Sequence, residues 1–247
     1  MVLEAKNSNI ILVTGGNRGI GLATLKTLAE NDNNTLISTY NSTLPTDNIF
    51  DRTNVEAIKC DITSGEELDS LFLKVKEDFG DPLTLICCAG ITKDALILRH
   101  KDSDFEKVIN SNLNAVYMTV RRAIPAMIKA RFGRIVLVSS VVGFMGSPGQ
   151  ISYAASKSAM LGMARSIVRE LSSRNITANV VAPGAIDTDM LKSAGDKRIQ
   201  EMTTLIPLGR IGEAQEVADT ICFLVSEKAS YINGAVITVD GGLGMGY

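Results

Sequence analysis

The sequence has few of the residues that build metal sites or disulfide frameworks. Its 247 residues include one histidine, His100, and four cysteines that show no C-x-x-C spacing. An H-E-x-x-H zinc motif is therefore absent, and a Ser-His-Asp triad would depend on His100 alone. We expect no metal site, and we expect His100 to be a solvated loop residue because it lies in the polar run 99–102.

Long apolar runs and an excess of positive charge are also missing. No stretch reaches the roughly 20 apolar residues that a membrane helix needs, and residues 1–9 lack the cationic start and apolar run of a secretory signal. The formal net charge of −2 argues against a protein that coats nucleic acid. We therefore expect a cytoplasmic protein with reduced cysteines that binds neither membrane nor nucleic acid.

The sequence does contain a regular alternation of short apolar runs and longer helical patterns. Several runs are apolar throughout, which is typical of parallel strands buried on both faces. The alternation predicts one α/β domain over residues 1–247, a doubly wound (Rossmann) parallel sheet of about seven strands with helices on both faces. The expected strands are 10–14, 35–39, 55–60, 83–88, 134–139, 177–181 and 235–239, and the expected helices are 19–31, 65–79, 103–130, 152–173 and 213–227.

One segment, 186–209, does not fit this alternation. It follows the sixth expected strand and mixes apolar side chains with charges and Gly195. We expect this segment to be a mobile cover over a substrate site rather than a core element, because such segments usually lie at the surface and carry function.

A glycine-rich turn joins the first expected strand to the first helix. Gly15, Gly19 and Gly21 form the pattern T-G-x-x-x-G-x-G within residues 14–21. Glycines allow backbone to approach a pyrophosphate closely, and a helix N-terminus adds N–H groups and positive potential. An ordinary βα turn is the alternative, but the position after the first strand favours a dinucleotide site.

The residues at the end of the second expected strand indicate which dinucleotide the site binds. NAD sites often carry a carboxylate there for the ribose 2′-hydroxyl, whereas this chain has neutral Asn41 and no carboxylate until Asp47. Arg18 lies in the glycine turn, where its guanidinium could meet a 2′-phosphate. We therefore predict NADP(H) as the cofactor.

A second group of polar residues indicates acid–base chemistry. Tyr153 and Lys157 are four residues apart on an expected helix and so share one face. A lysine ammonium beside a tyrosine favours the phenolate, so we expect Lys157 to lower the pKa of Tyr153. Ser140 follows the fifth strand, where a hydroxyl can donate to a substrate carbonyl. A surface Tyr–Lys pair is the alternative for these two residues taken alone.

With these motifs in view, the sequence resembles the short-chain dehydrogenase/reductase superfamily, and within it the bacterial 3-oxoacyl-[acyl-carrier-protein] reductases. The resemblance extends from Val13 to Tyr247. Its matching stretches are 14–21, 89–94, 112–113, 133–136, 140–143, 153–157, 179–184, 186–190 and 240–242.

The resemblance implies a catalytic tetrad of Asn112, Ser140, Tyr153 and Lys157. Tyr153 would be the general acid, Ser140 would polarise the keto oxygen, and Lys157 would bind the nicotinamide ribose. Asn112 would hold a water that relays protons to Lys157. The expected cofactor-binding residues are Gly15, Asn17, Arg18, Gly19, Ile20, Asn41, Asp61, Ile62, Gly90, Tyr153, Lys157, Ile186 and Thr188.

The chain departs from the family pattern after the fourth strand. The family usually has Asn-Asn-Ala-Gly there, and this chain has Cys87-Cys88-Ala89-Gly90. A thiol is a weaker hydrogen-bonding group than an amide. We expect Cys87 and Cys88 to be small buried residues on opposite faces of the strand; a redox pair is the alternative.

The resemblance also implies a homotetramer and an acyl carrier protein as partner. Carrier proteins are acidic, and the family places docking arginines at Arg131 and Arg174, which we expect near the mouth of the active site, contributed in an oligomer by different subunits. The alternative is that these cations only favour the helix dipoles.

The function expected from these residues is NADPH-dependent reduction of a 3-oxoacyl thioester in fatty acid biosynthesis. A reductase of acyl-CoA, a quinone or another small ketone is one alternative. A non-catalytic dinucleotide-binding sensor or assembly subunit is another.

Overall fold

The computed structural model describes residues 9–193 and 195–246; the segment 1–8, part of the stretch assessed above for a secretory signal, lies outside the described residues. The described chain forms one seven-stranded sheet in the order β3-β2-β1-β4-β5-β6-β7, with every neighbouring pair parallel. The predicted α/β class and the seven strands are confirmed. The strands are β1 (Asn9–Thr14), β2 (Asn34–Tyr40), β3 (Val55–Lys59), β4 (Thr84–Cys87), β5 (Gly133–Val138), β6 (Ile176–Pro183) and β7 (Val236–Val239).

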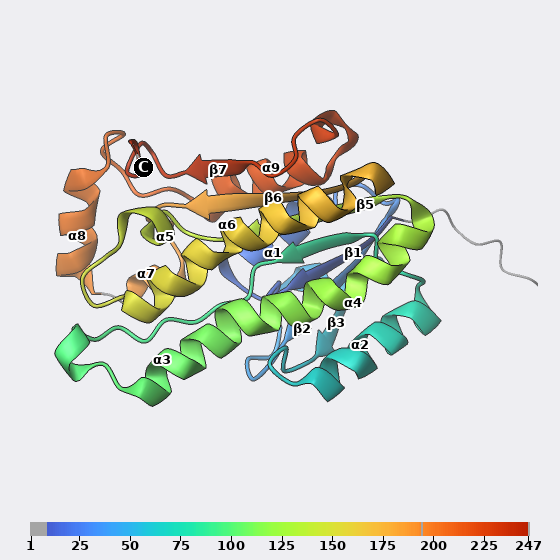
Figure 1. Ribbon diagram of the computed structural model, residues 1–247, viewed down its shortest axis with the longest axis horizontal. Helices are drawn as coiled ribbons and strands as arrows, with labels where there is room; N and C mark the ends of the chain where they lie inside the picture. Colours follow the sequence, from blue (N-terminus) through green and yellow to red (C-terminus); the bar gives the residue numbers. More distant parts are fainter. Residues whose placement is uncertain (1–8, 194, 247) are drawn as a thin grey trace, which may run out of the picture.

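Helices cover both faces of this sheet, as Figure 1 shows. In β1 the pleat sends Leu12 to one side, into the core formed with α2, α4 and α6, and Val13 to the other, toward α1 and α9. All residues of β4, β5 and β6 are buried, which explains why their sequences are apolar almost throughout. These helices are α1 (Gly19–Leu28), α2 (Gly65–Asp78), α4 (Ala115–Ala130), α6 (Ile151–Leu171) and α9 (Ala214–Val225).

The predicted helix 103–130 is not continuous. It consists of α3 (Asp102–Ile109), a π-helical turn at Asn110–Asn114 and then α4. A π turn widens the helix by one residue, and such turns recur at functional sites. Here the turn carries Asn112, whose side chain is fully buried.

The carboxyl ends of the strands meet a set of short helices. These are α5 (Val142–Met145), α7 (Asp189–Lys192) and α8 (Asp196–Leu205), grouped at one end of the molecule in Figure 1. The strand order reverses between β1 and β4, and ligands of open α/β sheets bind at such a point. The segment 186–209 lies here, as expected, and its motion stays a prediction; its residue 194 lies outside the described residues.

Within the part of the chain that the structure describes, no helix is both long and apolar enough to span a bilayer. No group of three histidine, cysteine or acidic side chains in that part could hold a metal ion.

Candidate active site

A cavity of about 790 Å³ lies at the carboxyl ends of the strands. The glycine turn lines one part of it, and Ser140, Tyr153 and Lys157 line another. Every predicted cofactor-binding residue is among its lining residues, although they come from six separate segments of the chain. Asn112 is not a lining residue but lies next to Gly90, which is one. Arg131 and Arg174 do not line the cavity.

The glycine turn has the shape that a pyrophosphate needs. Gly15 has a φ of +70°, and a Cβ there would lie 2.8 Å from the Cα of Ala89. A Cβ on Gly21 would lie 2.3 Å from the carbonyl oxygen of Gly15, so any side chain would close the turn. α1 begins at Gly19 and has no acidic residue in its first turn. The turn and this helix N-terminus therefore fit the phosphates of a dinucleotide.

The neighbouring end of the cavity is polar. Asp61 accepts hydrogen bonds from the hydroxyl of Thr63 at 2.7 Å and from its backbone N–H at 2.9 Å. These bonds, and to a smaller extent the amide of Asn41, lower the pKa of Asp61. The Asn17 amide donates to the carbonyl of Thr43 at 3.0 Å and so holds the glycine turn against the segment after β2. An ionised, oriented Asp61 suits hydrogen-bond donors of a bound nucleoside.

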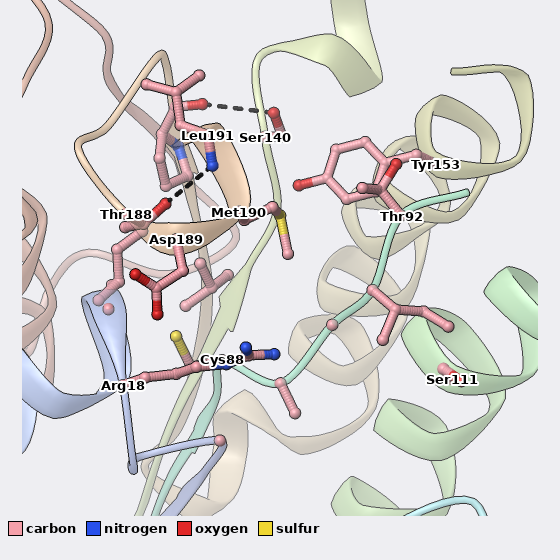
Figure 2. A pocket seen from close by; sticks show the side chains of 18 of the residues that line it. Arg18, Cys88, Thr92, Ser111, Ser140, Tyr153, Thr188, Asp189, Met190 and Leu191 are labelled. Carbon is pink, nitrogen blue, oxygen red and sulfur yellow. Dashed lines mark hydrogen bonds between the residues drawn. The ribbon is translucent and has the colours of Figure 1, made fainter. Parts of the chain in front are cut away.

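Tyr153 points its hydroxyl into the cavity, where Figure 2 shows it facing the side of the cavity that holds Met190 and Thr188. Burial raises the pKa of Tyr153 to about 12, and a hydrogen bond with Ser140 lowers it only in part. The expectation that Lys157 lowers this pKa is therefore wrong for this structure, because desolvation outweighs the other effects. Tyr153 keeps its proton at neutral pH, which suits a proton donor.

Lys157 is buried and tied to the sheet. Its ammonium Nζ donates to the carbonyl of Val138 at 2.8 Å and lies 5.6 Å from the centroid of the Tyr153 ring. Burial lowers the pKa of Lys157 to about 8. The Ser139 hydroxyl donates to the Lys157 carbonyl at 2.8 Å, so it fixes the helix that carries both Tyr153 and Lys157. Ser139 was not predicted from the sequence, where its only signal is its position next to Ser140.

The side chain of Asn112 connects the loop after β4 to α6 through hydrogen bonds. Its Oδ1 accepts from the N–H of Ile91 at 2.8 Å, and its Nδ2 donates to the Ile91 carbonyl at 2.9 Å and to the Ser156 hydroxyl at 3.2 Å. Both amide hydrogens are thus used within the protein. This holds Gly90 close to Lys157, since a Cβ on Gly90 would lie 3.5 Å from the Lys157 Nζ. The proton-relay role of Asn112 stays a prediction.

Ser140 lies two residues beyond the end of β5. Its hydroxyl oxygen accepts from the N–H of Val142 at 3.2 Å and lies 3.5 Å from the carbonyl oxygen of Pro183, the contact drawn in Figure 2. These two contacts orient the hydroxyl at the cavity wall, which Tyr153 also lines. Ser140 and Tyr153 can therefore bind the same substrate oxygen.

The two adjacent cysteines lie on opposite faces of the sheet, as predicted. Cys87 belongs to the core beneath α4 and α6, whereas Cys88 packs against the core beneath α1 and α9 and also lines the cavity. Burial raises the pKa of Cys87 to about 12 and that of Cys88 to about 11. Both thiols are therefore neutral at physiological pH.

His100 lies in a loop, as predicted, but it is half-buried rather than solvated. Its Nε2 lies 3.1 Å from the Ser152 hydroxyl and 3.1 Å from the carbonyl of Lys93, and its ring packs edge-on against Phe105. It joins α6 to the loop after β4. Only the fold brings these distant segments together, so the local polar sequence was misleading.

Further lining residues were also missed. The Arg198 guanidinium Nη1 donates to the Asp94 carboxylate at 3.1 Å, and the Gln150 amide donates to the same carboxylate at 3.0 Å. Met190 and Met202 line the cavity from the 186–209 segment. That segment is predicted to be a cover, and the sequence carries no signal for which of its side chains face inward.

Arg131 and Arg174 lie at the opposite end of the sheet from this cavity. They lie in the turns that lead into β5 and β6, and the Arg131 guanidinium donates to the Ser173 carbonyl at 3.3 Å. Six residues of β5 separate this end from the catalytic end, which is about 20 Å. The expectation that both arginines lie near the mouth of the active site is therefore wrong for the active site of their own chain.

Comparisons with known proteins agree with this geometry. The family described as "Enoyl-(Acyl carrier protein) reductase" matches residues 15–244. The 3-oxoacyl-[acyl-carrier-protein] reductase MabA of Mycobacterium tuberculosis is 44% identical over 240 residues, which cover 97% of this chain and 94% of that protein. MabA of Mycobacterium avium is 46% identical over 241 residues, covering 97% and 91%. The 3-oxoacyl-[acyl-carrier-protein] reductase FabG of Escherichia coli is 40% identical over 238 residues, covering 96% and 97%.

Proposed function

The chain belongs to the short-chain dehydrogenase/reductase family, and from this premise we propose that it reduces 3-oxoacyl-[acyl-carrier-protein] to the 3-hydroxyacyl product in fatty acid biosynthesis. It is an oxidoreductase of the C=O/CH–OH pair with a nicotinamide dinucleotide cofactor. The observation that carries the assignment of carbonyl reduction is the hydroxyl pair of Ser140 and Tyr153, which shares one cavity with the glycine turn; the 3-oxoacyl thioester comes from the relatives.

The chain's own residues supply binding, orientation and a proton. When bound, the cofactor supplies the hydride. Ser140 donates a hydrogen bond to the keto oxygen and polarises it. Tyr153 donates its proton to the same oxygen as negative charge develops there. Lys157 stands behind Tyr153 and binds the cofactor ribose, and Asn112 holds the adjoining loop.

A hydroxyl pair aimed at one oxygen favours a carbonyl over a carbon–carbon double bond, since an enoyl substrate must be protonated on carbon. The test is oxidation of NADPH with acetoacetyl and crotonyl thioesters of acyl carrier protein, coenzyme A and N-acetylcysteamine. We expect turnover of the acetoacetyl thioesters only. Turnover of crotonyl thioesters alone would replace the proposal by an enoyl reductase, and activity on none of the six would support a sensor.

NADP(H) is the proposed form of the cofactor. Arg18 is exposed at the rim of the cavity, and within the described part of the chain its guanidinium forms no ion pair. Asn41, which lines the same cavity, follows β2 at the position where an NAD-preferring site would carry a carboxylate. A cytoplasmic location accords with this use of NADPH.

A homotetramer is the proposed assembly. Large apolar side chains are exposed away from the cavity: Leu98 is 97% exposed, Tyr117 54% and Tyr231 101%. These side chains lie on three separate segments of the chain, and the contacts of a symmetric assembly would cover them. We expect light scattering at micromolar concentration to give about four times the chain mass of 26.4 kDa; a monomer mass would contradict the assembly.

Docking of the carrier protein at Arg131 and Arg174 requires the proposed tetramer. Since Arg131 and Arg174 lie at the far end of their own sheet, they can serve a catalytic cavity only if a neighbouring subunit presents them to it. Acyl carrier protein is acidic, and two adjacent arginines provide local positive charge on a chain of net charge −2.

Charge reversal tests this docking surface. In Arg131→Glu/Arg174→Glu we expect KM for the carrier-bound substrate to rise several-fold, because exposed charges act mainly on encounter. Turnover of the same acyl group on N-acetylcysteamine should hardly change. The matched control is Lys74→Glu/Lys76→Glu on α2, which removes two exposed lysines elsewhere. Equal loss on both substrates, or indifference of carrier-dependent activity to salt, would rule out docking here.

A further inference from the structure

Two cavities meet at α8. Arg198 and Met202 line the catalytic cavity, and the same two residues line a second cavity of about 740 Å³ beside it. In the described part of the chain they are the only residues common to both linings. These two side chains therefore form a partition between the cavities.

An ion pair holds this partition in place. The Arg198 guanidinium donates to the Asp94 carboxylate at 3.1 Å and to the Ser147 hydroxyl at 3.4 Å. Gln150 donates to the same carboxylate, so α8 is joined both to the loop after β4 and to the loop before α6. The Arg198 and Asp94 side chains are 34% and 30% exposed, and a pair at this depth can open at modest cost.

The second cavity offers apolar surface beyond the partition. Pro148, Met202 and Leu205 line it among polar residues, and Leu205 is 68% exposed. An exposed leucine beside a hollow is suited to an apolar ligand. Arg198 is already paired with Asp94, so it is less suited to the phosphate of a thioester arm. These features favour an acyl tail as the occupant.

We propose that Arg198 and Met202 form the end wall of the acyl-binding part of the catalytic cavity and thereby limit acyl chain length. The proposal rests on the proposed reduction of 3-oxoacyl thioesters. A short tail ends at the wall, whereas a longer tail must displace Arg198 from Asp94 before it reaches the second cavity. Removing the wall therefore favours long substrates selectively.

The experiment compares kcat/KM for acetoacetyl and 3-oxodecanoyl thioesters of N-acetylcysteamine. In Arg198→Ala and in Met202→Ala we expect the ratio of long to short substrate to rise about tenfold or more, because each newly buried methylene is worth about fourfold. Met202→Phe places a larger side chain in the wall and should lower the ratio of kcat/KM for the long substrate to that for the short one. Arg198→Lys keeps the ion pair and should stay near the parent.

Arg210→Ala is the matched control. It removes another arginine ion pair, with Glu216 at 2.7 Å, from the same region without touching either cavity, so the ratio should not change. Circular dichroism and NADPH affinity verify that each variant is folded. Should the parent fail to reduce the acetoacetyl thioester of acyl carrier protein, of coenzyme A and of N-acetylcysteamine alike, the proposed function is wrong. An active parent with unchanged ratios in the alanine and phenylalanine variants overturns the wall, as does an equal change in kcat/KM for the short and the long thioester.

Discussion

Tyr153→Phe is expected to lower kcat by about 10²- to 10⁴-fold, the usual contribution of general acid catalysis. Burial keeps the pKa of this tyrosine near 12, so its hydroxyl carries a proton throughout the neutral range. Phenylalanine retains the ring that packs in front of Lys157 but cannot protonate the substrate oxygen. Because the proton is transferred only in the transition state, the loss should appear in kcat and not in NADPH binding.

The measurement is steady-state NADPH oxidation together with NADPH affinity from fluorescence titration. Tyr117→Phe is the matched control, since Tyr117 lies on α4 outside the cavity and phenylalanine keeps the apolar ring that the proposed tetramer would cover. It should leave both quantities unchanged. A Tyr153→Phe enzyme that kept more than about a tenth of the parent kcat would show that another group protonates the product.

Arg18→Ala is expected to weaken NADPH binding by about 10- to 150-fold and to leave NADH binding nearly unaltered. A charge-assisted contact to phosphate is worth about 1.5–3 kcal/mol. Arg18 stands at the start of α1 on the rim of the cavity, and Asn41 offers a 2′-phosphate no repulsion. The selectivity of the parent for NADPH should therefore depend largely on this guanidinium.

Both dissociation constants are measured for the parent, for Arg18→Ala and for Lys26→Ala. Lys26 lies on the same helix but pairs with Asp47 at 2.6 Å and does not line the cavity. Lys26→Ala should change the affinities for NADPH and NADH only slightly and by the same factor. Equal kcat/KM for NADPH and NADH in the parent would contradict the assignment before any variant is made.

The local pattern of apolar residues was sufficient to predict the sheet from the sequence. The largely apolar runs at β1, β4, β5 and β6 identify strands buried on both faces, because helices cover both faces of this part of the sheet. The glycines at 15 and 21 identify the phosphate turn, since their positions tolerate no side chain. The spacing of Tyr153 and Lys157 places them on one helix face whatever the rest of the fold does.

Other properties depend on contacts between distant segments. The π turn around Asn112 and the position of His100 arise where α3, α6 and the loop after β4 meet. The pKa of Tyr153 rises instead of falling, because desolvation depends on everything that surrounds the ring.

The sequence by itself therefore determined the order of elements, the phosphate turn and the identity of the groups able to transfer a proton, because these depend on periodicity and local geometry. Tertiary structure alone decided that Arg131 and Arg174 lie at the far end of the sheet and that Arg198 meets Asp94, more than a hundred residues away, at the wall of the catalytic cavity. The physical reason is that strand direction and helix packing set which loops share an end of the sheet, and no local pattern of residues encodes that pairing.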